Sequence, residues 1–325
     1  MLQLFTIVDK VYYITIAAIG VPVNTLAIAI LSQGKCVLSR CTTHYLVAMA
    51  TADLMVIVTD VILYQLNHYF YQGSFLHLTP ACIGIQFLLY VSSDCSVWFT
   101  VTFSADWFVT ICCRRLKLKY YLVKIVAVIL LTTFILFFIK NVPIFITREP
   151  VMVVDNVHWS CQMKASYFTE LRWMVYDWFD KVLTPLLPFS LVLLFNALTV
   201  RYVLVVNRIR KGLRSQNTEE KRSDPEMESR RKSMILLFTI SSSFILLWSP
   251  YAINFLYYRI ATIDTKSYND SLHIFERIRY ILLSLSCCTN TFIYGVTQSK
   301  FRKQFMSAVK YPLTAISRVF TFRMN

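Results

Sequence analysis

Four aspartates interrupt stretches of sequence that are otherwise apolar and long enough to cross a lipid bilayer. A carboxylate in the middle of a bilayer is energetically costly, so it normally marks a binding site, an ion path or a paired charge. The four are Asp53, Asp60, Asp94 and Asp106. We expect Asp106, at the inner end of its stretch, to be satisfied by basic residues of the loop that follows it.

Asp53 is the carboxylate for which the sequence suggests specific neighbours. Ser96 and Asn290 lie in two other apolar stretches and would meet Asp53 if the three stretches pack together. Carboxylate, hydroxyl and amide oxygens suit a hard cation, so a sodium ion that acts allosterically is the expected metal. The alternative is a protonated, hydrogen-bonded Asp53 that braces the bundle. Apart from this ion, no cofactor is expected.

Residues that could support enzymatic catalysis do not form a recognisable pattern. There is no metal-binding motif such as His-Glu-x-x-His, and no nucleophile is placed next to a base. The histidines are scattered along the chain, at His44, His68, His77, His158 and His273. We therefore expect a protein that is not an enzyme.

The composition requires a solvent other than water for much of the chain. Of 325 residues, 56% are hydrophobic and 16% charged, and the mean hydropathy is +0.53. A soluble chain carries about a quarter charged residues. This balance excludes a soluble enzyme, a collagen-like fibre and a disulfide-dense secreted module. It favours an all-α membrane protein.

Seven apolar stretches are long enough to cross about 30 Å of hydrocarbon, which takes roughly 20 residues in a helix. They predict a seven-transmembrane helix bundle within residues 1–310, closed by a short amphipathic inner helix at 299–310 and followed by a tail at 311–325. No basic segment or cleavage pattern precedes Val11, so we expect a retained first span. The spans are about 11–31, 44–66, 82–111, 123–146, 174–206, 233–258 and 274–297.

The net charge of +15 is distributed unevenly along the chain. Most of the Lys and Arg residues fall in the loops at 32–43, 112–122 and 207–232 and in the tail. Loops rich in Lys and Arg lie in the cytoplasm, so we expect an extracellular N-terminus. The charge is thereby explained without nucleic acid, and anionic membrane lipids become the expected partners of the inner face.

The nine cysteines are distributed so that two fall on the outer side. Cys82 and Cys161 permit one disulfide, which would tie the loop at 147–172 over the mouth of the bundle. Two free thiols are the alternative. Asn269 begins an Asn-Asp-Ser sequence in the last outer loop, a glycosylation motif that also occurs often by chance.

Several short motifs in a fixed order resemble the rhodopsin-like (class A) G-protein-coupled receptors. The resemblance covers about residues 11–310, and each motif is weak alone but strong in this order and at these separations. The motifs are Gly20-x-Pro22-x-Asn24, Leu46-x-Ala48-x-Ala50-x-Ala52-Asp53-Leu54, Cys82, Asp106, Pro188, Phe244-x3-Trp248-Ser249-Pro250, and Asn290-x3-Tyr294 followed by Phe301-Arg302.

The resemblance implies a plasma-membrane, multi-pass receptor that passes an extracellular signal to a heterotrimeric G protein through movement of the sixth span. The ligand would be a small molecule or a peptide, held between the third, fifth, sixth and seventh spans. The expected pocket residues are Leu89, Tyr90, Ser93, Asp94, Trp178, Tyr251, Phe255 and Arg279. The expected activation switch contains Val97, Pro188, Phe244, Trp248, Pro250 and Tyr294. Asp94, Asp177 and Asp180 could attract a cationic group on the ligand.

The chain departs from the family where the receptor should meet its G protein. The usual Asp-Arg-Tyr is Asp106-Trp107-Phe108, and an indole cannot replace the bonds of a guanidinium. The expected interface also includes Arg230 and Arg231, where the family has an acidic residue. A receptor-like protein with weak or no G-protein coupling is therefore an alternative function.

Two details are Val11-Tyr12-Tyr13 running into Ile30-Leu31-Ser32-Gln33, and Leu187-Pro188 followed eight residues later by Asn196. They are similar to a branch of orphan receptors that respond to tryptophan and phenylalanine. In that branch an acidic residue and an arginine help to bind the amino acid, but the matching positions are Leu89 and Tyr251. Both charges are missing, so we do not expect this chain to bind the ligand of that branch. A different alternative is an ion or solute transporter that uses Asp53, Asp60 and Asp94 as its path, although no internal repeat supports it.

Overall fold

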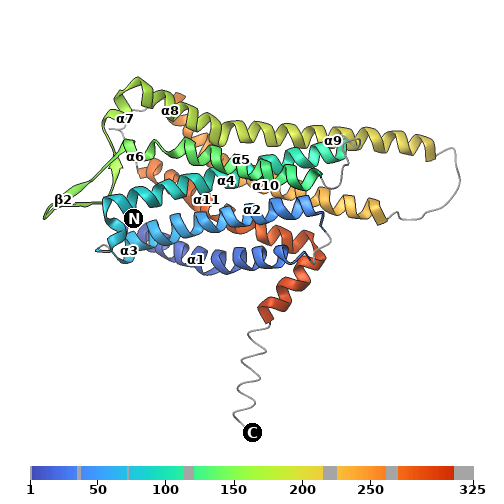
Figure 1. Ribbon diagram of the computed structural model, residues 1–325, viewed down its shortest axis with the longest axis horizontal. Helices are drawn as coiled ribbons and strands as arrows, with labels where there is room; N and C mark the ends of the chain where they lie inside the picture. Colours follow the sequence, from blue (N-terminus) through green and yellow to red (C-terminus); the bar gives the residue numbers. More distant parts are fainter. Residues whose placement is uncertain are drawn as a thin grey trace, which may run out of the picture.

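The chain is an all-α membrane protein built as a seven-transmembrane helix bundle, as predicted. The computed structural model describes residues 2–34, 38–71, 73–112, 121–214, 225–260 and 270–310. Within them, seven helical segments are long and apolar enough to cross a bilayer. The segments run roughly parallel along one long axis (Figure 1).

Each observed span contains most of the apolar stretch predicted for it, but several helices are longer. Four spans are single helices: α1 (Leu2–Ser32), α4 (Thr79–Cys112), α10 (Pro225–Ile260) and α11 (Asp270–Thr297). The second span consists of α2 (Arg40–Val56), η1 (Ile57–Leu66) and α3 (Asn67–Phe70), and the fourth of α5 (Tyr121–Asn141) and α6 (Ile144–Thr147). The fifth span consists of α8 (Leu171–Lys181), η4 (Val182–Leu186) and α9 (Leu187–Arg214). α1 begins nine residues earlier than predicted, α9 ends eight residues later and α10 begins eight residues earlier. Residues 299–310 form a further helix, which turns away from α11 in Figure 1.

The helices are stable in hydrocarbon because each satisfies its backbone hydrogen bonds within itself. Their apolar residues are spread around the helix axis. On α5, for example, Leu136 and Ile139 are 60% and 62% exposed. In water such surfaces would favour aggregation, whereas a bilayer solvates them. The exposed apolar side chains therefore face lipid, and the buried ones form the contacts between helices.

The fifth span is broken just before α9. Thr184 in η4 has φ −146° and ψ 104°, values outside the helical region, and Pro185 follows it. Pro188 lies in the first turn of α9, a position where a proline costs little because its missing N–H has no partner there anyway. Pro250 lies inside α10, which continues through it. The break in the fifth span therefore lies at Thr184.

The loop between the fourth and fifth spans is ordered by two short antiparallel strand pairs, one enclosing the other, and a disulfide. β1 (Arg148–Glu149) pairs with β4 (Gln162–Met163), and β2 (Met152–Val154) pairs with β3 (Val157–Trp159). Cys161 is joined to Cys82 at the start of α4, with an S–S distance of 1.97 Å. The predicted disulfide is thus confirmed. Figure 1 shows β2, α3 and the N-terminus at one end of the bundle, and the C-terminal end of α9 with the N-terminal end of α10 at the other.

Candidate functional site

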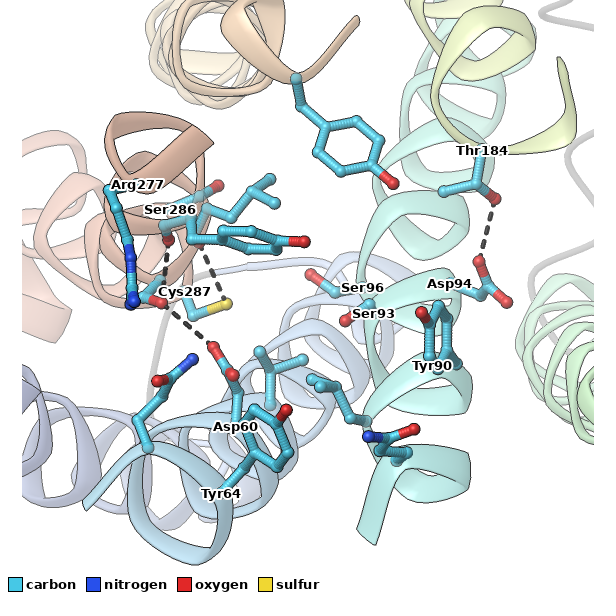
Figure 2. Close-up of a pocket in the computed structure, with 18 of the residues that line it drawn as sticks. Asp60, Tyr64, Tyr90, Ser93, Asp94, Ser96, Thr184, Arg277, Ser286 and Cys287 are labelled. Carbon is cyan, nitrogen blue, oxygen red and sulfur yellow. Dashed lines mark hydrogen bonds between the residues drawn. The ribbon is translucent and has the colours of Figure 1, made fainter. Parts of the chain in front are cut away.

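A cavity of about 920 Å³ lies inside the bundle at the end that carries the N-terminus and the strand pairs. Its wall includes Lys10 of α1, Arg148 of β1 and Met163 of β4, which places its mouth beside the disulfide-bonded loop. Deeper residues come from η1, α4, η4, α10 and α11. Figure 2 shows side chains from these elements converging on one space. The volume is that of a site for a small ligand or a peptide end.

The structure places five of the eight expected pocket residues on the wall of this cavity. They are Leu89, Tyr90, Ser93, Asp94 and Tyr251. Four of them, all except Tyr251, come from two successive turns of α4, because residues three and four apart lie on the same side of a helix.

The other three expected pocket residues have different positions. Trp178 is 46% exposed on α8 and does not line the cavity, which corrects the prediction. Arg279 lies beside the wall instead of on it, with its guanidinium 5.3 Å from the Tyr251 ring centre and 4.6 Å from that of Tyr280. The side chain of Phe255 lies outside the described residues.

Asp94 reaches the cavity wall, but its carboxylate is already occupied by the protein. Oδ2 accepts hydrogen bonds from Lys140 Nζ at 2.8 Å and from Asn141 Nδ2 at 2.7 Å, both at the end of α5. Oδ1 accepts from Thr184 Oγ1 at 2.9 Å, the bond drawn in Figure 2. Asp94 is therefore a poor anchor for a cationic ligand, which corrects the sequence-based expectation.

Lys140 is the centre of a buried ionic cluster that the sequence analysis did not foresee. It contacts Asp94 of α4 and also Asp180 of α8, and its side chain is only 7% exposed. Asp180 in turn is bonded to Lys181 at 2.9 Å. Two carboxylates and two ammonium groups offset each other here, so the cluster ties α4, α5 and α8 together.

Asp60 is the acidic residue of the cavity that the pocket prediction missed. It projects from η1 into the open space beside Tyr64, about two helical turns outward from Asp53 (Figure 2). Its Oδ2 accepts a long hydrogen bond of 3.4 Å from Ser284 of α11. Tyr280 and Arg277, also of α11, line the same region. Intramembrane acidity was the available sequence signal for Asp60, but it was assigned to a transporter path instead.

The basic side chains of the cavity gather near its mouth. Arg277 lies 3.4 Å from Asp9 in an ion pair, and it also donates to Tyr69 at 3.5 Å. Lys10 lies over the Tyr69 ring, with Nζ 5.6 Å from the ring centre. Arg148 is the third basic residue of the wall. The cavity is therefore positive toward its mouth and acidic toward its floor.

Beneath the cavity, Asp53 meets both of its suggested neighbours. Oδ1 accepts from Ser96 Oγ at 2.5 Å, and Oδ2 accepts from Asn290 Nδ2 at 2.8 Å. Asp53 is 1% exposed, and Ser96 also lines the cavity. One carboxylate with neutral oxygens fits a monovalent hard cation. Among the described residues, no group of three or more His, Cys, Asp or Glu side chains could hold a metal.

A packed cluster of apolar side chains connects the cavity to the inner half of the bundle. Trp248 lines the cavity, and its ring centre lies 5.6 Å from that of Phe244. The Phe244 ring centre in turn lies 5.6 Å from that of Phe189 of α9. Val97 of α4 is buried in the same cluster. Further inward, Tyr294 is completely buried against Phe301 of the helix at 299–310.

The inner end of α4 carries the atypical Asp106-Trp107-Phe108 sequence. The Trp107 ring packs edge-on against Phe103 at 6.3 Å, and its Nε1 is buried without a hydrogen-bond partner in the described part of the chain. Phe108 lies 5.9 Å from Phe195 of α9. The loop residues expected to satisfy Asp106 lie outside the described residues, as do the side chains of Arg230 and Arg231 and the whole of Asn269.

Comparisons with known proteins agree with this arrangement. Residues 23–294 match the family model described as 7 transmembrane receptor (rhodopsin family). The chain is also similar to the C-C chemokine receptor type 1 of Macaca fascicularis, with 22% identity over 299 residues that cover 90% of this chain and 76% of the relative. The matched segment contains the whole of α4, the cluster around Trp248 and the polar site at Asp53.

Proposed function

This chain belongs to the rhodopsin family of seven-transmembrane receptors, and we propose that it carries a signal from an extracellular ligand across the plasma membrane to a heterotrimeric G protein. It is a multi-pass membrane protein with a cavity inside its bundle. Membership of a receptor family favours this function over an enzyme or a transporter. The proposal concerns the ligand site, the direction of signalling and the inner partner.

The observation that carries the proposal is the double role of Trp248. Its ring forms part of the cavity wall, and the same ring packs on Phe244 within the cluster that joins α4, α9 and α10. A ligand that contacts Trp248 would therefore change the packing between α10 and its neighbours. Because packed cores switch between discrete arrangements, such a change can move the inner half of α10.

The ligand is proposed to enter at the disulfide-bonded loop. That loop would be extracellular, because the loops rich in Lys and Arg are those expected at the opposite end of the bundle. That basic inner face would contact anionic lipids. The ligand is a small molecule or the end of a peptide, since the cavity can hold no more than either. The identity to the chemokine receptor is too low to infer that this chain binds the same ligand. Leu89 and Tyr251 are uncharged, which argues against the receptor branch that responds to aromatic amino acids.

The inner switch would work without the usual arginine. Asp106, Trp107 and Phe108 are proposed to face the G protein together with Arg230 and Arg231. Trp107 is half-buried against Phe103 and offers no guanidinium to that partner. A receptor with weak coupling is therefore the second candidate function, and the observation that favours it is the packed Trp107 ring.

A panel of G-protein activation sensors in intact cells tests the proposal. Cells expressing the chain are screened against small-molecule and peptide libraries, with Trp248→Ala at matched surface expression as the signalling-defective control. We expect a ligand response, or a ligand-independent one, that Trp248→Ala reduces. Substrate-dependent flux in proteoliposomes, without activation of any G protein, would show instead that the chain is a transporter.

A further inference from the structure

One carboxylate on the cavity floor has no cationic partner in the described part of the chain. Asp60 accepts hydrogen bonds only from neutral side chains, Gln65 and Ser284, and the Ser284 bond is 3.4 Å long. No described Lys or Arg side chain lies within ion-pair distance of it. The other two acids of the wall, Asp94 and Asp180, both contact Lys140. Burying a carboxylate without a counter-charge is costly. The unmet charge is therefore a property of Asp60 alone among the three.

One polar atom of a second side chain on the same wall also lacks a partner, the amide oxygen of Gln86, although Gln86 Nε2 has one in Cys82 Sγ. Gln86 of α4 is 7% exposed and lines the cavity. Its Oε1 is buried and has no hydrogen-bond partner among the described residues. Buried polar atoms are almost always bonded, so an orphaned one inside a cavity indicates a missing ligand group. Asp60 and Gln86 Oε1 both accept hydrogen bonds, so the complementary group must be a donor, and the charge of Asp60 makes it a cation.

The rest of the wall is suited to the same kind of group. Tyr64, Tyr90, Tyr251 and Tyr280 all line the cavity. The negative faces of aromatic rings attract ammonium groups within about 6 Å. Figure 2 shows Tyr64 beside Asp60 on the same helix, with Tyr90 across the cavity on α4. A ring-lined space next to a carboxylate can hold both an amine and the apolar body that bears it.

The positive mouth limits where that charge can lie. Lys10, Arg148 and Arg277 are on the outer part of the wall. Among the described residues, Arg277 alone of the three forms an ion pair there, with Asp9. A ligand with cationic groups at both ends would meet like charge at the mouth. The wall therefore favours a single cation, placed deep against η1.

We propose that the cavity binds a ligand with one primary amine on an aromatic or aliphatic body, and that the ammonium group lies against Asp60 and Gln86. This inference rests on the proposed function, because it names the ligand class of the same site. The amine would supply the counter-charge that Asp60 lacks. Charge-assisted bonds of this kind are roughly twice as strong as neutral ones.

The test measures binding to the purified full-length chain in detergent. The probes are phenethylamine, neutral 2-phenylethanol and anionic 3-phenylpropionate, which share one body and differ in charge. We expect phenethylamine to raise the thermal stability of the wild type, and the other two not to do so. Asp60→Asn should weaken phenethylamine binding by about tenfold or more, which corresponds to the loss of one charge-assisted contact.

Matched variants separate this site from general effects. Asp155→Asn makes the same chemical change at an exposed hairpin turn and should leave binding unchanged. Gln86→Leu should weaken binding less than Asp60→Asn does, because it removes a neutral acceptor. If Asp60→Asn fails to fold, Asp60→Glu, which keeps the charge, replaces it and should retain selectivity for the amine.

Three results would overturn the inference: no stabilisation of the wild type by phenethylamine, equal stabilisation by 2-phenylethanol, or an Asp60→Asn affinity equal to that of the wild type. None of these measurements requires a G protein. Amine binding that depends on Asp60, without G-protein activation, would support the ligand class and refute the signalling proposal. G-protein activation by a different ligand, without amine binding, would support the signalling proposal and refute the ligand class.

Discussion

At the scale of single residues, four aspartates in membrane-spanning helices have four different environments. Asp53 is bonded to Ser96 and Asn290, and Asp94 is neutralised by Lys140. Asp60 faces an open cavity, and Asp106 lies at the inner end of α4. An aspartate in a membrane-spanning helix can thus hydrogen-bond to neighbouring helices, form a salt bridge or face a cavity. The neighbours on other helices decide which of these it does.

Trp107→Arg should raise G-protein activation, either agonist-driven or ligand-independent. The change restores a guanidinium beside Asp106 and removes a ring that packs on Phe103. Activation sensors at matched surface expression provide the measurement. Trp107→Phe, which keeps the packing without the charge, is the control. An unchanged response to Trp107→Arg would mean that position 107 does not limit coupling.

Asp53→Asn should abolish a specific effect of sodium on the purified protein. A sodium ion held by Asp53 and its neutral oxygen neighbours would bind the folded state only, and would raise the melting temperature by mass action. Thermal unfolding is compared in sodium and potassium chloride at equal ionic strength, with Asp155→Asn as the control. A wild type that responds equally to both salts would favour the bracing role for Asp53 and refute the ion site.

At the scale of elements, α4 is the helix against which the others are arranged. It packs against α2, α5 and α9, and its outer end is fixed by the disulfide to the loop. It also supplies Leu89, Tyr90 and Ser93 to the cavity. The cluster around Lys140 fastens α4 to α5 and α8 just outside the break at η4. Rigidity on this side would leave α10 as the element free to respond.

Lys140→Met should strongly destabilise the bundle, by about 3–5 kcal/mol, because it leaves Asp94 and Asp180 buried with less compensation. The measurement is the apparent melting temperature of the purified protein. Lys124→Met, at an exposed position of α5, should have little effect. Adding Asp94→Asn to Lys140→Met should recover part of the loss. Equal stability of the two lysine variants would show that the cluster contributes nothing net.

At the scale of the whole molecule, the two ends of the bundle have different chemistry. One end carries the N-terminus, the strand pairs, the disulfide and the cavity mouth (Figure 1). The other carries the C-terminal end of α9, the N-terminal end of α10 and the helix at 299–310. The proposed ligand site at one end and the proposed G-protein face at the other match the arrangement that transmembrane signalling requires.

An epitope tag at the N-terminus should be detected by antibody on intact cells, and a tag at the C-terminus only after permeabilisation. The reason is the attraction of basic loops to the cytoplasmic side. Asn269 should then be extracellular, so Asn269→Gln should remove a glycosidase-sensitive shift in mobility if the motif is used. Detection of the C-terminal tag on intact cells would reverse the orientation.

The sequence by itself determined the number of spans and the resemblance to the family, and it predicted the disulfide that the structure contains. A long apolar stretch predicts a membrane-spanning helix, because a helix satisfies all of its backbone hydrogen bonds within hydrocarbon. Cys82 and Cys161 were separated from the other cysteines by their outer position. Fixed motifs at fixed separations carried the resemblance, and the family model over residues 23–294 agrees with it.

Only the tertiary structure decided which polar groups meet. A helix that is apolar on every side has no periodic signal for its inward face, so span boundaries do not determine rotation. Trp178 was therefore assigned inward although it lies outward, and the neutralisation of Asp94 by Lys140 of another helix was missed. For the same reason, it became visible only when η1, α4 and α11 were packed together that Asp60, Gln86 and the tyrosines line one cavity.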